Sequence, residues 1–216
     1  MLACGGPFAV ARSKSSKRWL AEHFDDPYVK QAQQQGLRSR SAFKLEELNR
    51  KYGLLKKGMC VVDLGAAPGG WSQLAAREVG PGGRVLALDV LEMEPLAGVE
   101  FMQGDFTEPG ALEQLETLLG EGRVDLVLSD MAPNISGMDA VDQPRAMYLA
   151  ELALAFAGHW LKPGGDFLAK VFQGEGFDGF LQQCRSQFEK VLVRKPMASR
   201  SRSREVYLLG RARKLL

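Results

Sequence analysis

The chain has 216 residues, 45% of them hydrophobic and 25% charged, with a formal net charge of +2. This composition is typical of a globular protein and excludes a disordered or collagen-like chain, and the length allows a core that needs no disulfide or metal ion. No apolar run approaches the roughly 18 residues of a membrane span, and the first ten residues lack the basic start of a secretory signal. We therefore expect a cytoplasmic protein.

The predicted elements begin with two short basic helices, Pro27–Gln35 and Ala42–Tyr52, and continue with alternating strand and helix patterns. Such alternation is typical of an α/β fold, a mostly parallel sheet with helices on both faces. The expected strands are Met59–Leu64, Arg84–Val90, Val99–Met102, Val124–Ser129, Asp166–Phe172, Val191–Lys195 and Glu205–Leu209. The expected helices between them are Gly70–Val79, Pro109–Leu119, Asp142–Leu161 and Phe177–Phe188. A short basic loop joins the last two strands, so we expect that pair to be antiparallel.

A glycine-rich turn follows the first of these strands, in the segment DLGAAPGGWS at 63–72. A strand that runs into glycines and then opens a helix lets a ligand approach the backbone near a helix N-terminus. The spacing is not that of a dinucleotide site, because Gly65 and Gly69 are four residues apart. In addition, Pro68 occupies a place where such a site usually needs an N–H group.

Three acidic residues lie at the carboxyl ends of three successive strands: Asp89, Asp105 and Asp130. In open α/β sheets, ligands bind in the crevice at the carboxyl ends of the strands. Carboxylates at that edge suit a ligand with hydroxyl groups, an amine and a positive charge, and they suit a pyrophosphate poorly. The pattern favours S-adenosylmethionine as the cofactor, and a nicotinamide-dependent reductase is the alternative.

Cysteine and histidine usage predicts no metal site and no disulfide. Cys4, Cys60 and Cys184 are far apart and form no CxxC pair, and neither histidine lies in a ligand-spaced motif. We interpret Cys60, at the start of an apolar strand, as a packing residue.

Positive charge is concentrated at the two ends of the chain. Residues 1–60 have a net charge of +7, residues 61–183 of −13 and residues 184–216 of +8. Arginines mixed with serines at both ends are typical of contacts to phosphate, so the pattern favours a nucleic-acid partner. The candidate phosphate-binding residues are Arg38, Arg40, Arg200, Arg202 and Arg204. No exposed apolar helix stripe indicates a subunit interface, and we expect a monomer.

The segments GLRSRSAFKLEELN, DLGAAPGGW, LSDMAPNISG, LAKVFQGEGF and SRSREVYLLG closely resemble the FtsJ/RrmJ-type family. These are bacterial enzymes that methylate the 2′-hydroxyl of a uridine ribose in RNA of the large ribosomal subunit. The resemblance runs from about Arg12 to Gly210. It implies a Rossmann-like methyltransferase fold with seven strands, the last antiparallel, and the large ribosomal subunit as partner.

The resemblance also implies a domain arrangement. Residues 1–11 have no counterpart in the family and are expected to be a disordered extension. Residues 12–216 are expected to form one methyltransferase domain, with basic helices at 12–58, a sheet core at 59–210 and a basic tail at 211–216.

The site residues implied by the resemblance fall into two groups. Cofactor contacts are implied at Gly69, Trp71, Asp89, Asp105 and Asp130. Trp71 rests on the resemblance alone, since an aromatic residue in the first turn of a helix is more often part of the core. A catalytic Lys–Asp–Lys–Glu tetrad corresponds to Lys44, Asp130, Lys170 and Glu205.

The chemistry needs one proton to leave the ribose hydroxyl while oxygen, methyl carbon and sulfur are aligned. Lys170 lies in an apolar strand and is the predicted base, with Lys44 as a neighbouring cation and Asp130 and Glu205 as orienting groups. The sequence leaves open whether Lys170 accepts the proton or only steers the hydroxyl. It also leaves open a transfer RNA substrate, and a ribosome assembly factor whose methyl transfer is incidental.

Overall fold

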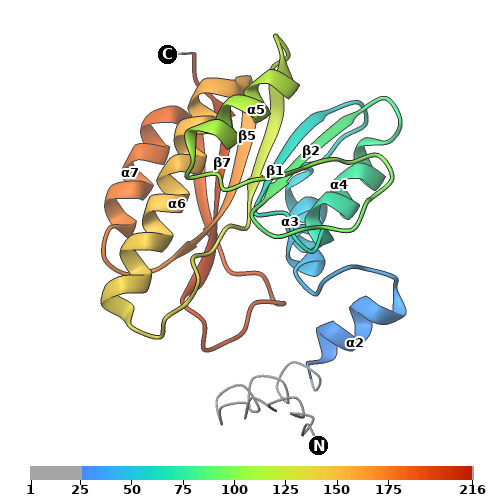
Figure 1. Cartoon of the computed structure of the whole chain (residues 1–216). Helices are drawn as coiled ribbons and strands as arrows, with labels where there is room; N and C mark the ends of the chain where they lie inside the picture. The colour runs from blue at the N-terminus through green and yellow to red at the C-terminus, as the bar shows by residue number, and fades with distance from the viewer. Residues whose placement is uncertain (1–25, 216) are drawn as a thin grey trace, which may run out of the picture.

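A seven-stranded sheet forms the centre of the computed structural model, which describes residues 26–215 (Figure 1). Its strands are β1 (Cys60–Leu64), β2 (Arg84–Asp89), β3 (Glu100–Gln103), β4 (Val124–Ser129), β5 (Leu161–Phe172), β6 (Phe188–Arg194) and β7 (Glu205–Arg213). Their order is β3-β2-β1-β4-β5-β7-β6. β7 is antiparallel to β5 and β6, and the other pairs are parallel. This confirms the predicted α/β fold. The predicted extension, 1–11, lies outside the described residues.

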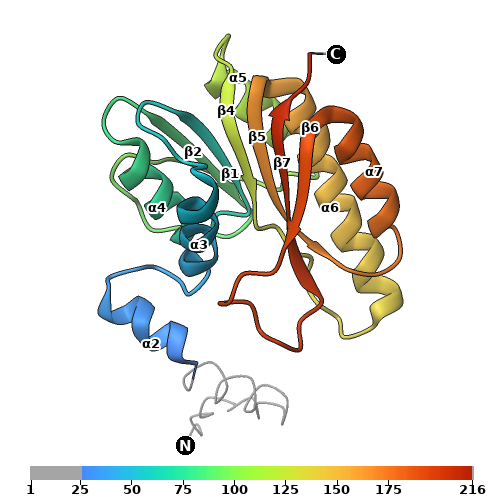
Figure 2. The ribbon, with the colours of Figure 1, turned by 180° about the vertical axis from the view of Figure 1, so that it is seen from behind.

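Helices cover both faces of the sheet (Figures 1 and 2). They are α2 (Pro27–Gln34), α3 (Ala42–Tyr52), α4 (Gly70–Val79), α5 (Pro109–Leu119), α6 (Asp139–Trp160) and α7 (Phe177–Gln187). α3 and α4 pack on one face, and α5, α6 and α7 pack on the other. Within 26–215, no helix is both long and apolar enough to cross a membrane.

The two cores follow from the alternation of side chains along strands that are buried on both faces. In β4, Leu126 and Leu128 face α3 and α4, whereas Val127 faces the other helices, and all three are fully buried. Neighbouring β1 does the same with Val61 and Val62. Each such side chain contributes about 1.5–3 kcal/mol on burial. The apolar runs therefore explain why these two strands occupy the middle of the sheet.

β5 begins earlier than the sequence predicts. The Lys-Pro-Gly-Gly segment at 162–165 was expected to end a helix and precede a strand at Asp166, but it lies inside β5. Leu161 pairs with Val124, the register then shifts, and Asp166 pairs with Leu126. Proline and glycine mark an irregularity at the start of the strand here, which is another common use of these residues.

The last strands are also longer than expected. β6 begins at Phe188, directly after α7, and β7 continues to Arg213, past the predicted end at Leu209. Antiparallel pairing of Phe188 with Arg213 extends both strands over a basic segment that has little strand character by itself.

α2 lies at the lower end of the molecule in Figure 1 and contacts the rest of the fold through a small number of residues of α3 and of the β6–β7 loop. Asp26 caps the helix by accepting a hydrogen bond from the Tyr28 amide at 3.0 Å. The same carboxylate pairs with Arg40, which also donates to the carbonyl of Ala198 in the β6–β7 loop. Beneath these contacts, Phe43 of α3 is buried against Ala198. The contacts hold α2, α3 and the β6–β7 loop together.

Asp63 lies in β1 and is fully buried beneath the glycine-rich turn. Its Oδ2 accepts a hydrogen bond from the Ser72 hydroxyl at 2.6 Å, and its Oδ1 has no partner among the described residues. Burial raises the pKa of Asp63 to about 7, against the lowering effect of Ser72 and with small contributions from Asp130 and Asp89. The folded protein therefore takes up a proton that the unfolded chain releases between about pH 4 and 7.

We expect Asp63→Asn to stabilise the protein by up to about 4 kcal/mol at pH 8 and by only about 1.5 kcal/mol at pH 5. The stability that the neutral Asp63 carboxyl contributes to the wild type is fully present below the unfolded pKa, and it is lost as the pH rises from there through the folded pKa of about 7. Urea unfolding of both proteins at the two pH values measures the difference. An equal difference at pH 5 and pH 8 would contradict the burial of an ionisable Asp63.

Candidate active site

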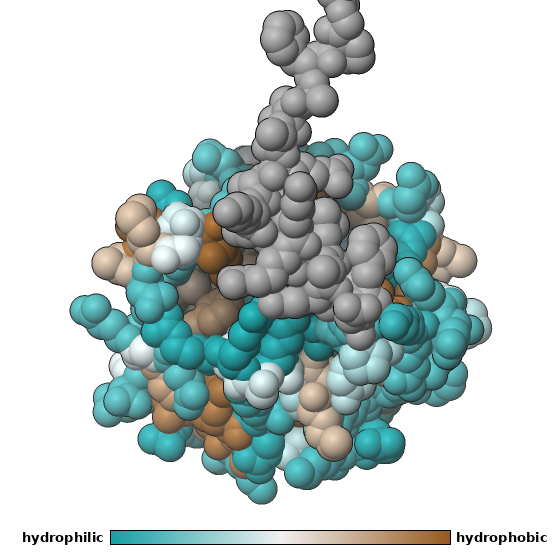
Figure 3. Space-filling view, turned by 90° about the horizontal axis from the view of Figure 1, so that it is seen from below, coloured by the Kyte–Doolittle hydropathy of each residue, from teal (hydrophilic) through white to brown (hydrophobic). Residues whose placement is uncertain are grey.

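The loops after β1, β2, β3 and β4 border a pocket of about 480 Å³. This edge of the sheet points downward in Figure 1 and is viewed in Figure 3, where hydrophilic residues predominate among those coloured. The three predicted acids, Asp89, Asp105 and Asp130, all line the pocket. Parallel strands bring their carboxyl ends to one edge, so the topology gathers these three residues as the sequence predicts.

The glycine-rich turn forms one wall of the pocket. Gly65 has a φ of +76°, and a Cβ atom there would lie 2.7 Å from the Met131 amide nitrogen. Gly69 is the N-cap that precedes α4, with a φ of +105°, and a Cβ atom there would lie 2.9 Å from the sulfur of Met93. Both positions therefore require glycine, because the turn packs closely against the loops that follow β2 and β4.

Asp89 fastens the glycine-rich turn to the end of β2. Its Oδ2 accepts a hydrogen bond from the Ala67 amide at 2.9 Å, and its Oδ1 accepts one from the Leu91 amide at 2.8 Å. Each carboxylate oxygen can accept more than one hydrogen bond, so both can still bind hydroxyl donors of a ligand.

Asp105 follows β3 on the exposed side of the pocket. Its Oδ1 accepts hydrogen bonds from the hydroxyl of Thr107 at 2.7 Å and from the Thr107 amide at 2.9 Å. These two bonds hold the pKa of Asp105 below its usual value, so the residue is a carboxylate at neutral pH.

Asp130 and Lys170 form the link between the pocket and the tetrad. The Lys170 ammonium lies 3.1 Å from Asp130 Oδ1 and donates a hydrogen bond to the Asp130 carbonyl at 2.6 Å. The Lys170 side chain is only 10% exposed. The two contacts hold its Nζ at a defined position at the rim of the pocket.

Lys44 and Glu205 form the second half of the tetrad. Lys44 Nζ lies 2.6 Å from Glu205 Oε1 and 3.1 Å from the Tyr207 hydroxyl. Tyr207 in turn donates to Asp130 Oδ1 at 3.1 Å. The predicted tetrad is therefore one connected network, in which a buried tyrosine joins the two ion pairs.

The electrostatics of this network keep two of its members, Glu205 and Tyr207, in defined protonation states. Burial alone would raise the pKa of Glu205, but Lys44, Ser199 and Lys170 together outweigh burial and lower it. Burial, reinforced by the charges of Asp130 and Glu205, raises the pKa of Tyr207 well above its usual value. Glu205 is thus a carboxylate and Tyr207 a neutral hydrogen-bond donor at physiological pH.

Trp71 lies in the core and does not line the pocket. It is 2% exposed, its indole N–H donates to the Ser41 carbonyl at 2.9 Å, and its ring is 5.7 Å from that of Tyr207. Gly69 is part of the turn, but the pocket wall is formed by Gly65 and Ala67. The cofactor contacts predicted for Trp71 and Gly69 stay predictions.

Two of the candidate phosphate-binding arginines make internal contacts. The Arg38 guanidinium donates to the carbonyls of Pro68, Glu94 and Pro95, which joins the glycine-rich turn to the loop after β2. Arg40 is engaged with Asp26, as described above. Both residues therefore shape the edge on which the pocket lies.

The other three arginines belong to the β6–β7 loop and the residues directly before β7. Arg200 Nε lies 4.0 Å from Asp26 Oδ2, and Arg204 pairs with Asp139 of α6 at 2.7 Å. Arg202 and Arg204 border a hollow of about 180 Å³ beside the loop after β4. The structure thus places these arginines at the pocket edge, and their phosphate contacts stay predictions.

Tyr207 is the member of the network that the sequence analysis missed. It is two residues after Glu205 in β7, so both side chains are on the same face of the strand. It also pairs directly with Lys170 across β5 and β7. The spacing from Glu205 was the available signal, but a tyrosine in an apolar strand is read first as a core residue.

Comparison with known proteins gives a consistent result over most of the chain. Residues 37–213 match a family described as FtsJ-like methyltransferase. The chain is 63% identical over 205 residues to ribosomal RNA large subunit methyltransferase E of Xanthomonas euvesicatoria and 64% identical over 205 residues to that of Stenotrophomonas maltophilia. In both cases the match covers 95% of this chain and 98% of the relative.

A solved structure is also similar. The chain superposes on a ribosomal RNA methyltransferase from Plasmodium falciparum with a TM-score of 0.71 and 26% identity, covering 82% of this chain and 98% of the other. The fold neighbour therefore agrees with the sequence relatives.

We expect Tyr207→Phe to destabilise the protein by about 1–3 kcal/mol, because Lys44 and Asp130 each lose a buried hydrogen bond. Tyr52→Phe is the matched control. Its hydroxyl accepts a hydrogen bond from Arg194 at a half-buried position, where water can replace it. Urea unfolding measures both. Equal, small losses would mean that the Tyr207 hydroxyl does not join the two ion pairs.

Proposed function

The chain belongs to the FtsJ-like methyltransferase family, and from this premise we propose that it transfers a methyl group from S-adenosylmethionine to a uridine 2′-hydroxyl. The proposed substrate is RNA of the large ribosomal subunit, as the names of the relatives indicate for those proteins. One observation carries the proposal. Asp130 lines the pocket and also contacts Lys170, so a cofactor site and a proton-handling group meet at one residue.

The pocket fits S-adenosylmethionine by its hydrogen-bond acceptors, its negative charge and its size. Asp89 and Asp105 offer carboxylate oxygens to hydroxyl groups, and the three acids of the pocket suit a ligand that carries positive charge. A volume of about 480 Å³ is within the range of small-molecule sites. When bound, the cofactor supplies a methyl group activated by the sulfonium and a neutral thioether as leaving group.

The same pocket argues against the alternative of a nicotinamide-dependent reductase. Among the described residues that line it, none is Lys or Arg. A pyrophosphate would meet three carboxylates there and no cation. Pro68 also places a proline nitrogen, which cannot donate, where another residue of the turn would offer an amide N–H.

Lys170 is the proposed base. Its contacts with the carboxylate and the carbonyl of Asp130 fix its Nζ beside the pocket, where an acceptor hydroxyl can reach it. To act as the base, Lys170 first releases its own proton to solvent, and the neutral amine then takes the hydroxyl proton as the oxygen–methyl bond forms and the sulfur–methyl bond breaks. Asp130 orients Lys170 and faces the cofactor pocket, so it acts in both cofactor binding and proton transfer.

The Asp130–Lys170 pair is held in place by three further residues of the network, Lys44, Glu205 and Tyr207. The Lys44–Glu205 ion pair is largely withdrawn from water, with side chains 11% and 14% exposed. Tyr207 donates a hydrogen bond to Asp130 Oδ1, which restricts the position of the Asp130 carboxylate. These residues are therefore placed to position Asp130 and Lys170 and to keep the local charge balanced.

RNA binding is assigned to the arginines of the β6–β7 loop, which lies at the same edge as the pocket (Figure 1). Arg200, Arg202 and Arg204 can contact phosphates on either side of the acceptor nucleotide, and the affinity should fall as salt is raised. A ribosomal RNA substrate also accounts for the expected location in the cytoplasm.

The experiment that tests the function measures tritium transfer from labelled S-adenosylmethionine to three acceptors, followed by nucleoside analysis. The acceptors are naked large-subunit RNA, undermethylated large subunits and transfer RNA. We expect labelled 2′-O-methyluridine. Label in transfer RNA alone would move the substrate to another RNA. No label in any RNA, despite cofactor binding, would contradict the proposal.

Lys170→Ala should lower methyl transfer by at least 100-fold while cofactor affinity stays within about threefold, because the residue handles the proton and does not line the pocket. Lys51→Ala, which changes an exposed lysine at the far end of α3, is the control. Asp130→Ala should weaken both transfer and cofactor binding. Substantial activity in Lys170→Arg would show that Lys170 orients the hydroxyl as a charged donor and does not act as the base.

A further inference from the structure

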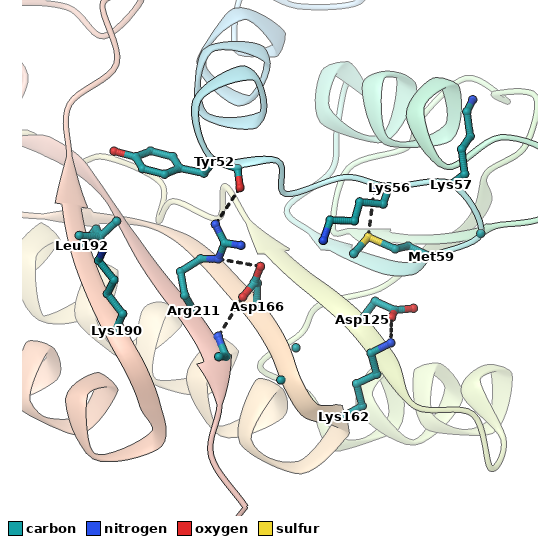
Figure 4. A pocket seen from close by; sticks show the side chains of 14 residues that line it. Tyr52, Lys56, Lys57, Met59, Asp125, Lys162, Asp166, Lys190, Leu192 and Arg211 are labelled. Carbon is teal, nitrogen blue, oxygen red and sulfur yellow. Dashed lines mark hydrogen bonds and ion pairs between the residues drawn. The ribbon is translucent and has the colours of Figure 1, made fainter.

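A larger pocket opens at the opposite edge of the sheet, where β4 and β5 begin (Figure 4). Its volume is about 790 Å³, against about 480 Å³ for the pocket at the carboxyl ends. Its walls come from the start of β5, the start of β6, the end of β7 and the segment before β1. No residue of the tetrad and no candidate cofactor residue lines it. We call it the amino-edge pocket.

Among the described residues that line this pocket, basic residues outnumber acidic residues by five to two. The basic residues are Lys56, Lys57, Lys162, Lys190 and Arg211, and the acidic residues are Asp125 and Asp166. Lys57 points away from the other side chains in Figure 4, so four cations remain for the pocket itself.

Both acids are already engaged. Asp125 forms an ion pair with Lys162 and accepts a hydrogen bond from the Cys60 amide at 2.8 Å. Asp166 Oδ2 lies 2.9 Å from Arg211 Nε. These two pairs are internal to the pocket wall and are drawn as dashed lines in Figure 4.

Lys56 and Lys190 are left in excess. Within the part of the chain that the structure describes, no carboxylate lies within 4 Å of either ammonium, and both side chains are exposed. They reach the pocket from different segments, one before β1 and the other in β6. Cations gathered around one hollow repel each other, and an anion bound between them relieves that repulsion.

The surface of the pocket suits phosphate groups. Gly58, Gly164 and Gly165 line it, so the backbone is not covered by side chains there. The aromatic residue in its wall, Tyr52, has its hydroxyl bound by Arg194. Lysines recognise phosphates as point charges, and such contacts position a nucleic acid without reading its sequence.

We propose that the amino-edge pocket binds the phosphodiester backbone of a segment of ribosomal RNA other than the one that carries the acceptor hydroxyl. The inference rests on the proposed function for the identity of the polyanion. β1 alone spans about 16 Å between the two edges, at ~3.3 Å per residue. A folded RNA or an assembled subunit can contact both edges at once, whereas a short strand in the active site reaches only one.

The test compares Lys56→Gln/Lys190→Gln with Arg50→Gln/Arg185→Gln, which removes two charges from exposed positions outside the pocket. Binding of naked large-subunit RNA, of undermethylated subunits and of a short acceptor oligonucleotide is measured over a range of salt concentrations. The pocket variant should bind the long RNA or the subunits about tenfold more weakly at low salt. The slope of log affinity against log salt should fall by about 1.5, since each lost phosphate contact contributes ~0.7–0.9. Oligonucleotide binding and the control variant should change less than about twofold.

Equal losses in the pocket variant and in the control, or an unchanged slope, would overturn the proposal. A pocket variant that loses binding of inorganic pyrophosphate but keeps full affinity for RNA would also overturn it, because the ligand would then be a small free anion. Failure of the wild type to methylate any RNA counts against the proposed function and leaves this binding comparison readable.

Discussion

The contact between Asp130 and Lys170 is the constraint on which the rest of the candidate site depends. Asp130 follows β4 and Lys170 lies in the neighbouring β5, so the parallel pairing of these strands sets the position of both. Two charges held 3.1 Å apart with little exposure to water interact more strongly than an exposed pair. Because Asp130 also lines the pocket at the carboxyl ends of the strands, the position of the lysine is fixed relative to the methyl donor that we propose for that pocket.

The fold could be predicted from the sequence wherever apolar runs and turn residues agree. Val124–Ser129 and Pro109–Leu119 have the bounds that their patterns predict. The predicted start of β5 at Asp166 is wrong. Pro163 and Gly164 are typical of a loop, but the pairing of Leu161 with Val124 places this segment in the sheet. Pairing with a neighbouring strand can override the loop preference of a short segment, and the identity of that neighbour cannot be read from the segment itself.

The parts of the candidate site that could be predicted are those determined by the order of the strands or by a family motif. Acids at strand ends meet because parallel strands end at one edge, and the tetrad follows from the family resemblance. The internal contacts of Arg38 could not be predicted, since its acceptors are backbone carbonyls of Pro68, Glu94 and Pro95, distant in sequence and common to every residue type. The amino-edge pocket was missed because its lining comes from several separate segments, none of which forms a motif.

β7 connects the two edges of the molecule through one face of a single strand. One face of β7 carries every second residue, namely Glu205, Tyr207, Leu209 and Arg211. Glu205 and Tyr207 belong to the network around Asp130, and Arg211 lies in the wall of the amino-edge pocket. Because side chains alternate with a period of two, a slip of one residue would turn all four to the other face of the sheet. The length of this strand is therefore under a double restriction. A one-residue insertion or deletion within it would turn the residues on one side of the change to the other face, so the two edges could not both keep their side chains. Substitutions, in contrast, can change either edge alone.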